Sequence, residues 1–225
     1  MRKFIPVLAC LVFILGSIPI CATSQDTKSK YDILLQSLIE KVKSKDPSLG
    51  DTKVASQAFK ELRFAYTETP QYKPYGGIKA ETGEAMLTAV SNKEYKKALE
   101  YAEKILKEDY VDIDAHVVAS TAYRKTGNQE RADYHEAIAN ILFLSMLDGG
   151  NGDKPETAIE VISTDEEYSF LNISGLKERS QAALQSNGHN YDKLTVVDPV
   201  SGKTFEMYFC IDKPVNWLRN SLKSQ

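Results

Sequence analysis

Three helical patterns follow one another in residues 92–147, and the rest of the chain flanks them. In residues 93–107, apolar side chains recur every three or four positions and lysines occupy the opposite face. The second pattern ends at Gly127, a residue that readily adopts the left-handed conformation found after helices. The third begins near Gln129 and becomes apolar almost all round. We therefore expect its second half to be buried on several sides.

Small residues in this stretch follow the spacing of tetratricopeptide-like helix hairpins. Ala98 precedes Ala132 by 34 residues, which is the period of that repeat. The second unit matches the pattern at Ser120, Tyr123, Gly127, Ala132 and Ala139. Two units are too few to bury a core of their own, so we expect flanking elements to cover them.

Two further helices are predicted before this centre. The first occupies residues 31–42 and stops before Pro47, because proline disfavours helical conformation in the preceding residue. Asp51 or Thr52 can cap the second, which runs to Tyr66. Its expected buried face consists of Val54, Ala58, Phe59, Leu62 and Ala65.

A loop at residues 69–77 connects these helices to one expected at residues 79–90. Its two prolines and two glycines exclude a regular element. The loop carries Tyr72 and Tyr75. Because prolines stiffen its backbone, these tyrosines lose little conformational entropy when they make a contact. Their rings either cover the end of the helical core or bind a ligand.

A glycine-rich loop at residues 148–153 ends the last central helix. Its carboxylates, including Asp153, could accept a calcium ion, but the spacing and terminal glutamate of an EF-hand are missing. We expect its glycines to turn the chain with positive φ and expect no metal there.

The remaining chain changes to extended patterns. A short strand is predicted at residues 158–162, followed by Thr164 and Glu167 at the spacing of a capping box. Residues 191–197 and 204–211 then predict a β-hairpin. A lone hairpin is marginally stable, so this one should recruit the first strand and lie against helices.

Composition narrows the classes of function. The chain is 42% hydrophobic and 26% charged, as is typical of soluble globular proteins. Its net charge is −3 and the sequence contains no basic stripe, so we do not expect nucleic acid as a partner. The histidines lack close metal-ligand spacing, and Cys210 lies in a predicted strand. No hydrolase signature appears. We expect no cofactor, no metal and no enzyme activity.

The first 24 residues predict a secretory signal peptide. Arg2 and Lys3 precede an apolar run, and Ala22-Thr-Ser24 offers a cleavage site before Gln25. A lipid anchor at Cys21 is the alternative, although the residue before a lipidated cysteine is normally small. We expect a periplasmic or secreted protein whose membrane contact is limited to these residues.

Several short motifs together resemble a known family. They are Tyr72-Lys-Pro-Tyr75, the loop at residues 149–153, Glu167-Tyr168 and Tyr208-Phe209-Cys-Ile-Asp212. In this order they resemble the exported bacterial proteins grouped as domain of unknown function 4919, over residues 31–222. The resemblance implies export from a bacterium and a tetratricopeptide-like helical half, and it assigns no catalytic residue.

These patterns predict an α+β fold that is mostly α, with tetratricopeptide-like helical hairpins followed by a small antiparallel β-sheet with short helices. Residues 1–24 form the signal peptide and residues 25–147 the helical region. Residues 148–225 form a C-terminal α/β unit packed on the helices.

The leading functional prediction is a non-enzymatic module of the cell envelope that binds a peptide or protein. The alternative is a small ligand-binding or hydrolase-like site between the loops at residues 148–153 and 69–77. The candidate binding residues are Tyr72, Tyr75, Asp153, Glu167 and Tyr168.

Overall fold

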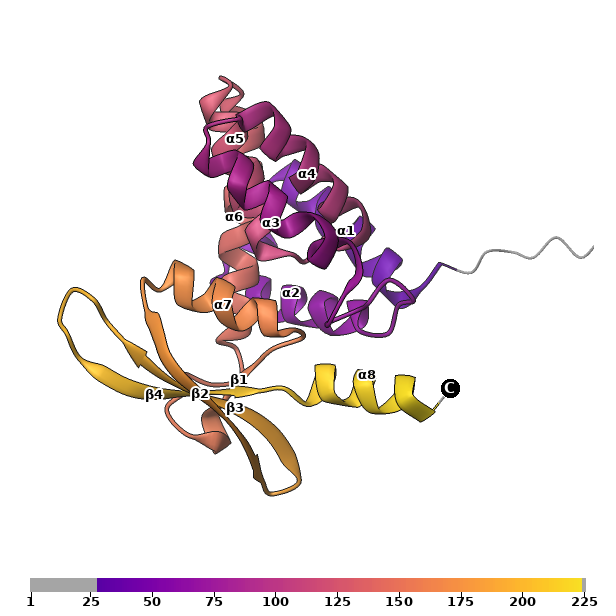
Figure 1. Cartoon of the computed structure of the whole chain (residues 1–225). Coiled ribbons are helices and arrows are strands. Elements are labelled where there is room, and N and C mark those ends of the chain that lie inside the picture. The colour runs from indigo at the N-terminus through magenta and orange to yellow at the C-terminus, as the bar shows by residue number, and fades with distance from the viewer. Residues whose placement is uncertain (1–27, 224–225) are drawn as a thin grey trace, which may run out of the picture.

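The computed structural model describes residues 28–223, which form a helical part followed by a four-stranded sheet (Figure 1). This arrangement confirms the predicted α+β class with mostly helical content. The predicted signal peptide and Cys21 lie outside the described residues. In chain order the elements are α1 (Lys30–Ser44), α2 (Thr52–Tyr66), α3 (Gly77–Ser91), α4 (Tyr95–Glu108), α5 (Ile113–Lys125), α6 (Gln129–Met146), β1 (Ile159–Glu160), α7 (Thr164–Ile173), β2 (Lys177–Ser186), β3 (His189–Val197), β4 (Thr204–Cys210) and α8 (Asp212–Lys223).

The helix ends follow local sequence signals. The Asp51 side chain accepts hydrogen bonds from the first amides of α2, as an N-cap residue does. Gly127 has a φ of 88° and follows Thr126, the C-cap residue of α5, as predicted for a residue that ends a helix. The helices predicted from apolar spacing are therefore confirmed.

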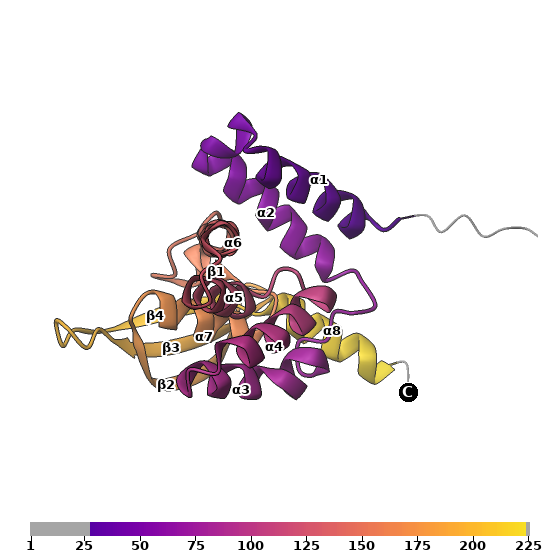
Figure 2. The same cartoon turned by 90° about the horizontal axis from the view of Figure 1, so that it is seen from above.

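Consecutive helices from α3 to α6 pack on one another, and α2 packs on α6. Figure 2 shows α1 and α2 on one side of α6, with α3 and α4 on the other side. Ala98, Ala132 and Ser120 are buried among these helices, so small side chains do stand where the helices approach closely. The tetratricopeptide-like character of this part stays a prediction.

The buried stripe of α2 differs from the predicted one. Phe59 and Leu62 are buried as expected, but Val54 in the first turn is exposed and Ala58 is half-buried. The stripe passes through Ala55 instead, one residue further along, and it includes the fully buried Arg63. Apolar periodicity alone could not place an arginine on this face.

Arg63 forms a buried ion pair with Glu166 of α7. Its Nε donates to one carboxylate oxygen of Glu166 at 2.8 Å, and Nη2 donates to the other at 2.5 Å. Nη2 also donates to the Glu160 carbonyl at 3.0 Å, and Nη1 donates to Ser145 Oγ at 3.3 Å. One guanidinium thus joins α2, α6, β1 and α7 through charge-assisted hydrogen bonds.

The N-terminus of α7 differs from the predicted capping box. Ser163, not Thr164, is the N-cap, and its hydroxyl accepts from the Glu166 amide. The Glu166 carboxylate does not return to the cap, since it binds Arg63 and accepts from the Ile162 amide at 2.8 Å. Glu167 is therefore free of the capping role assigned to it, because the helix starts one residue earlier than the sequence pattern indicates.

The sheet has the strand order β1-β4-β3-β2, and β1 runs parallel to β4 while the other pairs are antiparallel. The small sheet that was predicted as antiparallel is therefore mixed, because the β1–β4 pair is parallel. The β3–β4 hairpin does recruit the short β1 strand, as predicted. Strand β2 was missed, because its residues are mostly polar and almost all exposed, so it shows no apolar alternation.

One cluster of buried side chains joins the helical part to the sheet. Helix α7 packs between them, in contact with α5 and with β2 (Figure 1). A second cluster lies within α3, α4 and α5. Within residues 28–223, no helix has the length and apolar character needed to cross a membrane. The joining cluster includes Leu62, Met146, Ile159, Phe170, Leu194 and Phe209.

The glycines after α6 serve two different purposes. Only Gly152 has a positive φ, of 80°, so the expectation that Gly149 and Gly150 also need one was wrong. Gly150 is needed for space, since a Cβ there would lie 2.1 Å from the Thr157 carbonyl oxygen. The chain therefore crosses itself closely at this point.

We predict that Gly150→Ala lowers the free energy of unfolding by about 1–3 kcal/mol, because the backbone at Thr157 must move to admit a methyl group. Gly50→Ala is the matched control, since a Cβ there meets nothing within 4 Å, and it should be neutral or slightly stabilising. Urea unfolding of both variants measures the difference. Equal stability of Gly150→Ala and the parent chain would contradict the close crossing.

Candidate functional site

An open groove of about 720 Å³ lies between α3, the loop at residues 69–77 and α7. Tyr75 of the loop, Leu87 of α3 and Tyr168 of α7 line it, and their side chains are 48%, 49% and 43% exposed. Isolated exposed apolar residues are ordinary, but three that border one groove form a contact surface. We call this feature the α3–α7 groove.

Carboxylates outnumber cations in the lining of the α3–α7 groove. Glu84, Asp114 and Asp165 contribute negative charge, and Lys79 contributes the one cation among the lining residues. Lys79 is already paired, since its ammonium lies 2.7 Å from Asp112 and 3.1 Å from Asp114. The groove therefore presents aromatic rings beside a net negative charge.

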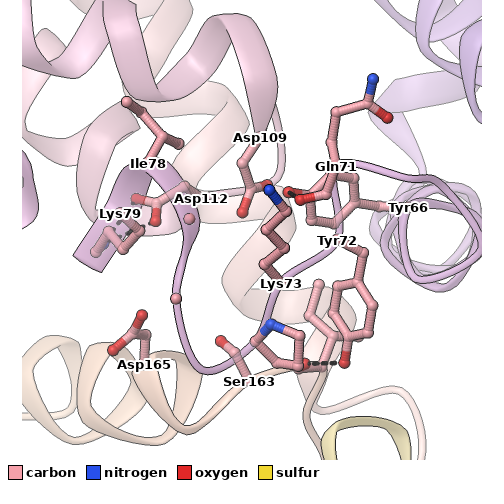
Figure 3. A pocket seen from close by; sticks show the side chains of 14 residues that line it. Tyr66, Gln71, Tyr72, Lys73, Ile78, Lys79, Asp109, Asp112, Ser163 and Asp165 are labelled. Carbon is pink, nitrogen blue, oxygen red and sulfur yellow. Dashed lines mark hydrogen bonds and ion pairs between the residues drawn. The ribbon is translucent and has the colours of Figure 1, made fainter. Parts of the chain in front are cut away.

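A small cavity of about 40 Å³ adjoins the groove, and the two share Lys79 and Asp165 in their linings. Figure 3 shows Lys79 and Asp112 on one side of this cavity and the Tyr66 and Tyr72 rings on the other. A volume of this size holds a water molecule or two and excludes a larger ligand. The cavity is therefore a polar extension of the groove.

Burial shifts the protonation of the charged residues around this cavity. Burial, and next the charge of Asp112, raises the pKa of Asp109 well above its usual value. Burial also raises the pKa of Asp112, and Lys79 opposes that rise. For Lys79 burial acts to lower the pKa, but attraction to Asp112 and Asp114 outweighs it and raises the pKa. Lys79 thus stays charged and holds the acidic residues together.

The two tyrosines of the loop have different roles. Tyr72 is buried, its hydroxyl donates to the Ile162 carbonyl at 2.5 Å, and its ring packs edge-on against Tyr66. This tyrosine covers the end of the helical core and fixes the loop to the start of α7. Tyr75 is exposed, with its ring 6.4 Å from that of Trp217, and it remains available for contact with a ligand.

Glu167 was predicted in the site, and it lies fully buried instead. Neither of its carboxylate oxygens has a hydrogen-bond partner of normal geometry within the described residues, although the Asp192 carboxyl group lies close enough to interact with it. Burial, and next the charge of Asp192 in β3, raises the pKa of Glu167 to about 9. Glu167 is therefore a neutral acid at pH 7, and it is not among the residues that line the groove.

Asp153 lies apart from the groove as well. It is exposed and accepts a hydrogen bond from the Asn151 side chain in the glycine-rich loop. That loop packs on the sheet, where the Gly152 carbonyl accepts from the Tyr208 amide. Of the five predicted residues, the structure brings Tyr75 and Tyr168 together in the groove, and it does not join the loops at residues 148–153 and 69–77 in one site.

The fold also brings together histidines that are distant in the sequence. His116 Nδ1 lies 3.0 Å from His135 Nδ1, and His116 Nε2 lies 2.9 Å from the Tyr110 carbonyl oxygen, to which it can donate. Burial lowers the pKa of His116 to about 3 and that of His135 to about 4, so the pair is neutral. These histidines form a packed, uncharged contact between α5 and α6.

The fold and the groove together define an α+β protein with a surface groove between a helical layer and the helix that covers its sheet. The family described as Domain of unknown function (DUF4919) matches residues 20–219, and the chain therefore belongs to this family. No curated protein and no solved structure gives a significant match.

Glu167 should make stability fall as pH rises. The folded state keeps its proton up to about pH 9, whereas the unfolded chain releases it near the ordinary value of 4.5, so stability is lost across this interval. We predict that Glu167→Gln flattens this fall and is more stable than the parent chain at alkaline pH by at least about 1 kcal/mol.

Thermal unfolding from acidic to alkaline pH measures this effect. Asp153→Asn is the control, since it removes a carboxylate that is exposed at the surface. If Glu167→Gln and the parent chain lose stability in parallel with rising pH, the raised pKa of Glu167 is refuted.

Proposed function

We propose that this protein is an exported bacterial binding module without enzyme activity, and that the α3–α7 groove holds an extended segment of a peptide or protein. The single observation that carries the proposal is the grouping of Tyr75, Leu87 and Tyr168, all exposed, around one groove with excess negative charge. Export is supported by the signal-peptide pattern of the first 24 residues.

The aromatic residues favour a macromolecular ligand. Tyrosine supplies a large contact area with few rotatable bonds, and it is enriched in the energetic centres of protein interfaces. Tyr75 and Tyr168 come from separate elements, the loop and α7, and both elements are fixed by buried contacts. The surface is therefore preorganised, which lowers the entropy cost of binding.

The charges define the kind of segment that fits. Glu84, Asp114 and Asp165 favour lysine or arginine side chains, and Lys79 cannot offset them because Asp112 and Asp114 already engage it. Arginine and lysine also stack their cationic groups on tyrosine faces. The proposed ligand is thus a basic segment with interspersed apolar side chains.

The open shape of the groove favours binding at a surface over the hydrolase-like alternative. Its open shape leaves no enclosed volume around a reactive group, and neither Glu167 nor Asp153 lines it. Binding through a shallow surface is the chemistry that its residues favour.

A pair of labelled peptides tests the proposal. In one, lysine alternates with leucine, and in the other glutamate replaces every lysine. Fluorescence anisotropy should show binding of the lysine peptide only, and Tyr75→Ser and Tyr168→Ser should each weaken it by at least about tenfold. Both tyrosines are substantially exposed, so these variants should keep the parent melting temperature.

Phe205→Ser is the matched control, because Phe205 is an equally exposed aromatic residue in β4, outside the groove. It should bind the lysine peptide as the parent chain does. Binding that is unchanged in both tyrosine variants, or equal for the two peptides, would contradict the assignment of the groove.

A further inference from the structure

The fold brings a histidine, a cysteine and an aspartate together where β3 begins and β4 ends. Tyr191 of β3 is paired with Cys210, the last residue of β4. His189 comes two residues before Tyr191 and lies beside Asp212, the first residue of α8. Side chains two residues apart in a strand share a face. His189 therefore projects from the same side of the sheet as Cys210, and Asp212 joins them from the start of α8.

Their donor atoms lie within reach of one metal ion. A ring nitrogen of His189, the Cys210 Sγ and a carboxylate oxygen of Asp212 are all within 4.8 Å of one another. A tetrahedral zinc site has Zn–S near 2.3 Å and Zn–N or Zn–O near 2.0–2.1 Å, which separates its donors by roughly 3.3–3.6 Å. The three side chains therefore need only small adjustments to bind.

The carboxylate is held in a defined orientation. Asp212 Oδ1 accepts from both the backbone amide and the side-chain amide of Asn190, each at 2.8 Å. Its other oxygen, Oδ2, faces His189 Nδ1 at 2.6 Å. Such outer hydrogen bonds orient metal ligands and increase affinity. The arrangement leaves Oδ2 as the atom directed toward the cluster.

The cluster borders an open cavity of about 350 Å³, which is also lined by Tyr191, Glu156 and Lys213. Three protein ligands facing such a space leave a fourth position for water or another small ligand, as in zinc sites with an open coordination position. Thiolate and imidazole together favour zinc over magnesium or calcium, which prefer oxygen ligands alone.

We propose that His189, Cys210 and Asp212 form a zinc-binding site with one open position toward this cavity. Zinc bound there ties the start of β3 to the junction of β4 with α8. The site is separate from the α3–α7 groove, because the two are lined by different residues.

Cys210 binds zinc as the thiolate, and the bound metal ion displaces the thiol proton.

Cobalt(II), a spectroscopic substitute for zinc, tests the site directly. The full chain carrying Cys10→Ser and Cys21→Ser keeps Cys210 as its sole thiol. Titration with Co²⁺ should produce thiolate-to-metal charge-transfer absorption and tetrahedral visible bands, both removed by added Zn²⁺. Zn²⁺ should also raise the melting temperature by mass action.

Cys210→Ser should abolish the charge-transfer absorption, and His189→Gln and Asp212→Asn should each weaken Zn²⁺ binding by at least about tenfold. Glu206→Gln removes a carboxylate from the same strand outside the cluster and should bind as the parent does. Melting curves without metal identify any variant that fails to fold. The His189 side chain is mostly exposed, so His189→Gln should fold as the parent does and reports on zinc binding alone. Absence of thiolate absorption, or zinc affinity unchanged in His189→Gln, would overturn the proposal.

Discussion

The ion pair between Arg63 and Glu166 is the constraint on which the arrangement of this fold depends. Both side chains are buried, and together they satisfy the Glu160 carbonyl and the Ile162 amide at the edge of the sheet. Removing one partner of such a pair typically costs about 3–5 kcal/mol, because the other charge is left buried alone. The main effect of the ion pair is therefore to fix the positions of α7 and β1 on the helical layer, and its contribution to net stability is smaller.

The position of α7 in turn determines the α3–α7 groove. Tyr168 projects from α7, and the loop that carries Tyr75 is joined to Ile162, two residues before that helix, through the Tyr72 hydroxyl. Both aromatic contacts are therefore held by buried hydrogen bonds close to Glu166. The groove is a consequence of how the helical layer and the sheet are joined, which is why its parts come from distant stretches of the chain.

Much of the helical architecture could be predicted because its signals are local. Asp51 and Gly127 lie where a cap and a helix end require such residues, and the apolar spacing of the central stretch indicated its helices. Strand β2 could not be found in this way. Its stability comes from pairing with β3 across the turn at Asn187 and Gly188, and its polar sequence carries no pattern of burial.

The candidate sites were less accessible to sequence reasoning. Arg63 lies on a helix face that otherwise reads as apolar, and its partner is 103 residues away in the chain. Glu166 and Glu167 are adjacent, but with Ser163 as the N-cap of α7 their environments differ: Glu166 binds Arg63, and Glu167 is buried. The predicted cap lay one residue later, so the sequence pattern assigned the capping role to Glu167. The cluster at His189, Cys210 and Asp212 depends on strand register, which alternation alone leaves open.

Hydrogen exchange of Arg63→Met measures the central claim most directly, namely that the buried pair fixes α7 and β1 on the helices. The account predicts that amides of residues 159–173 lose protection well before those of α4 and α5, through local opening. The double variant Arg63→Met/Glu166→Leu should recover much of that protection, since no unpaired charge is left. An equal loss of amide protection throughout residues 28–223, or unchanged protection in α7, would contradict the account.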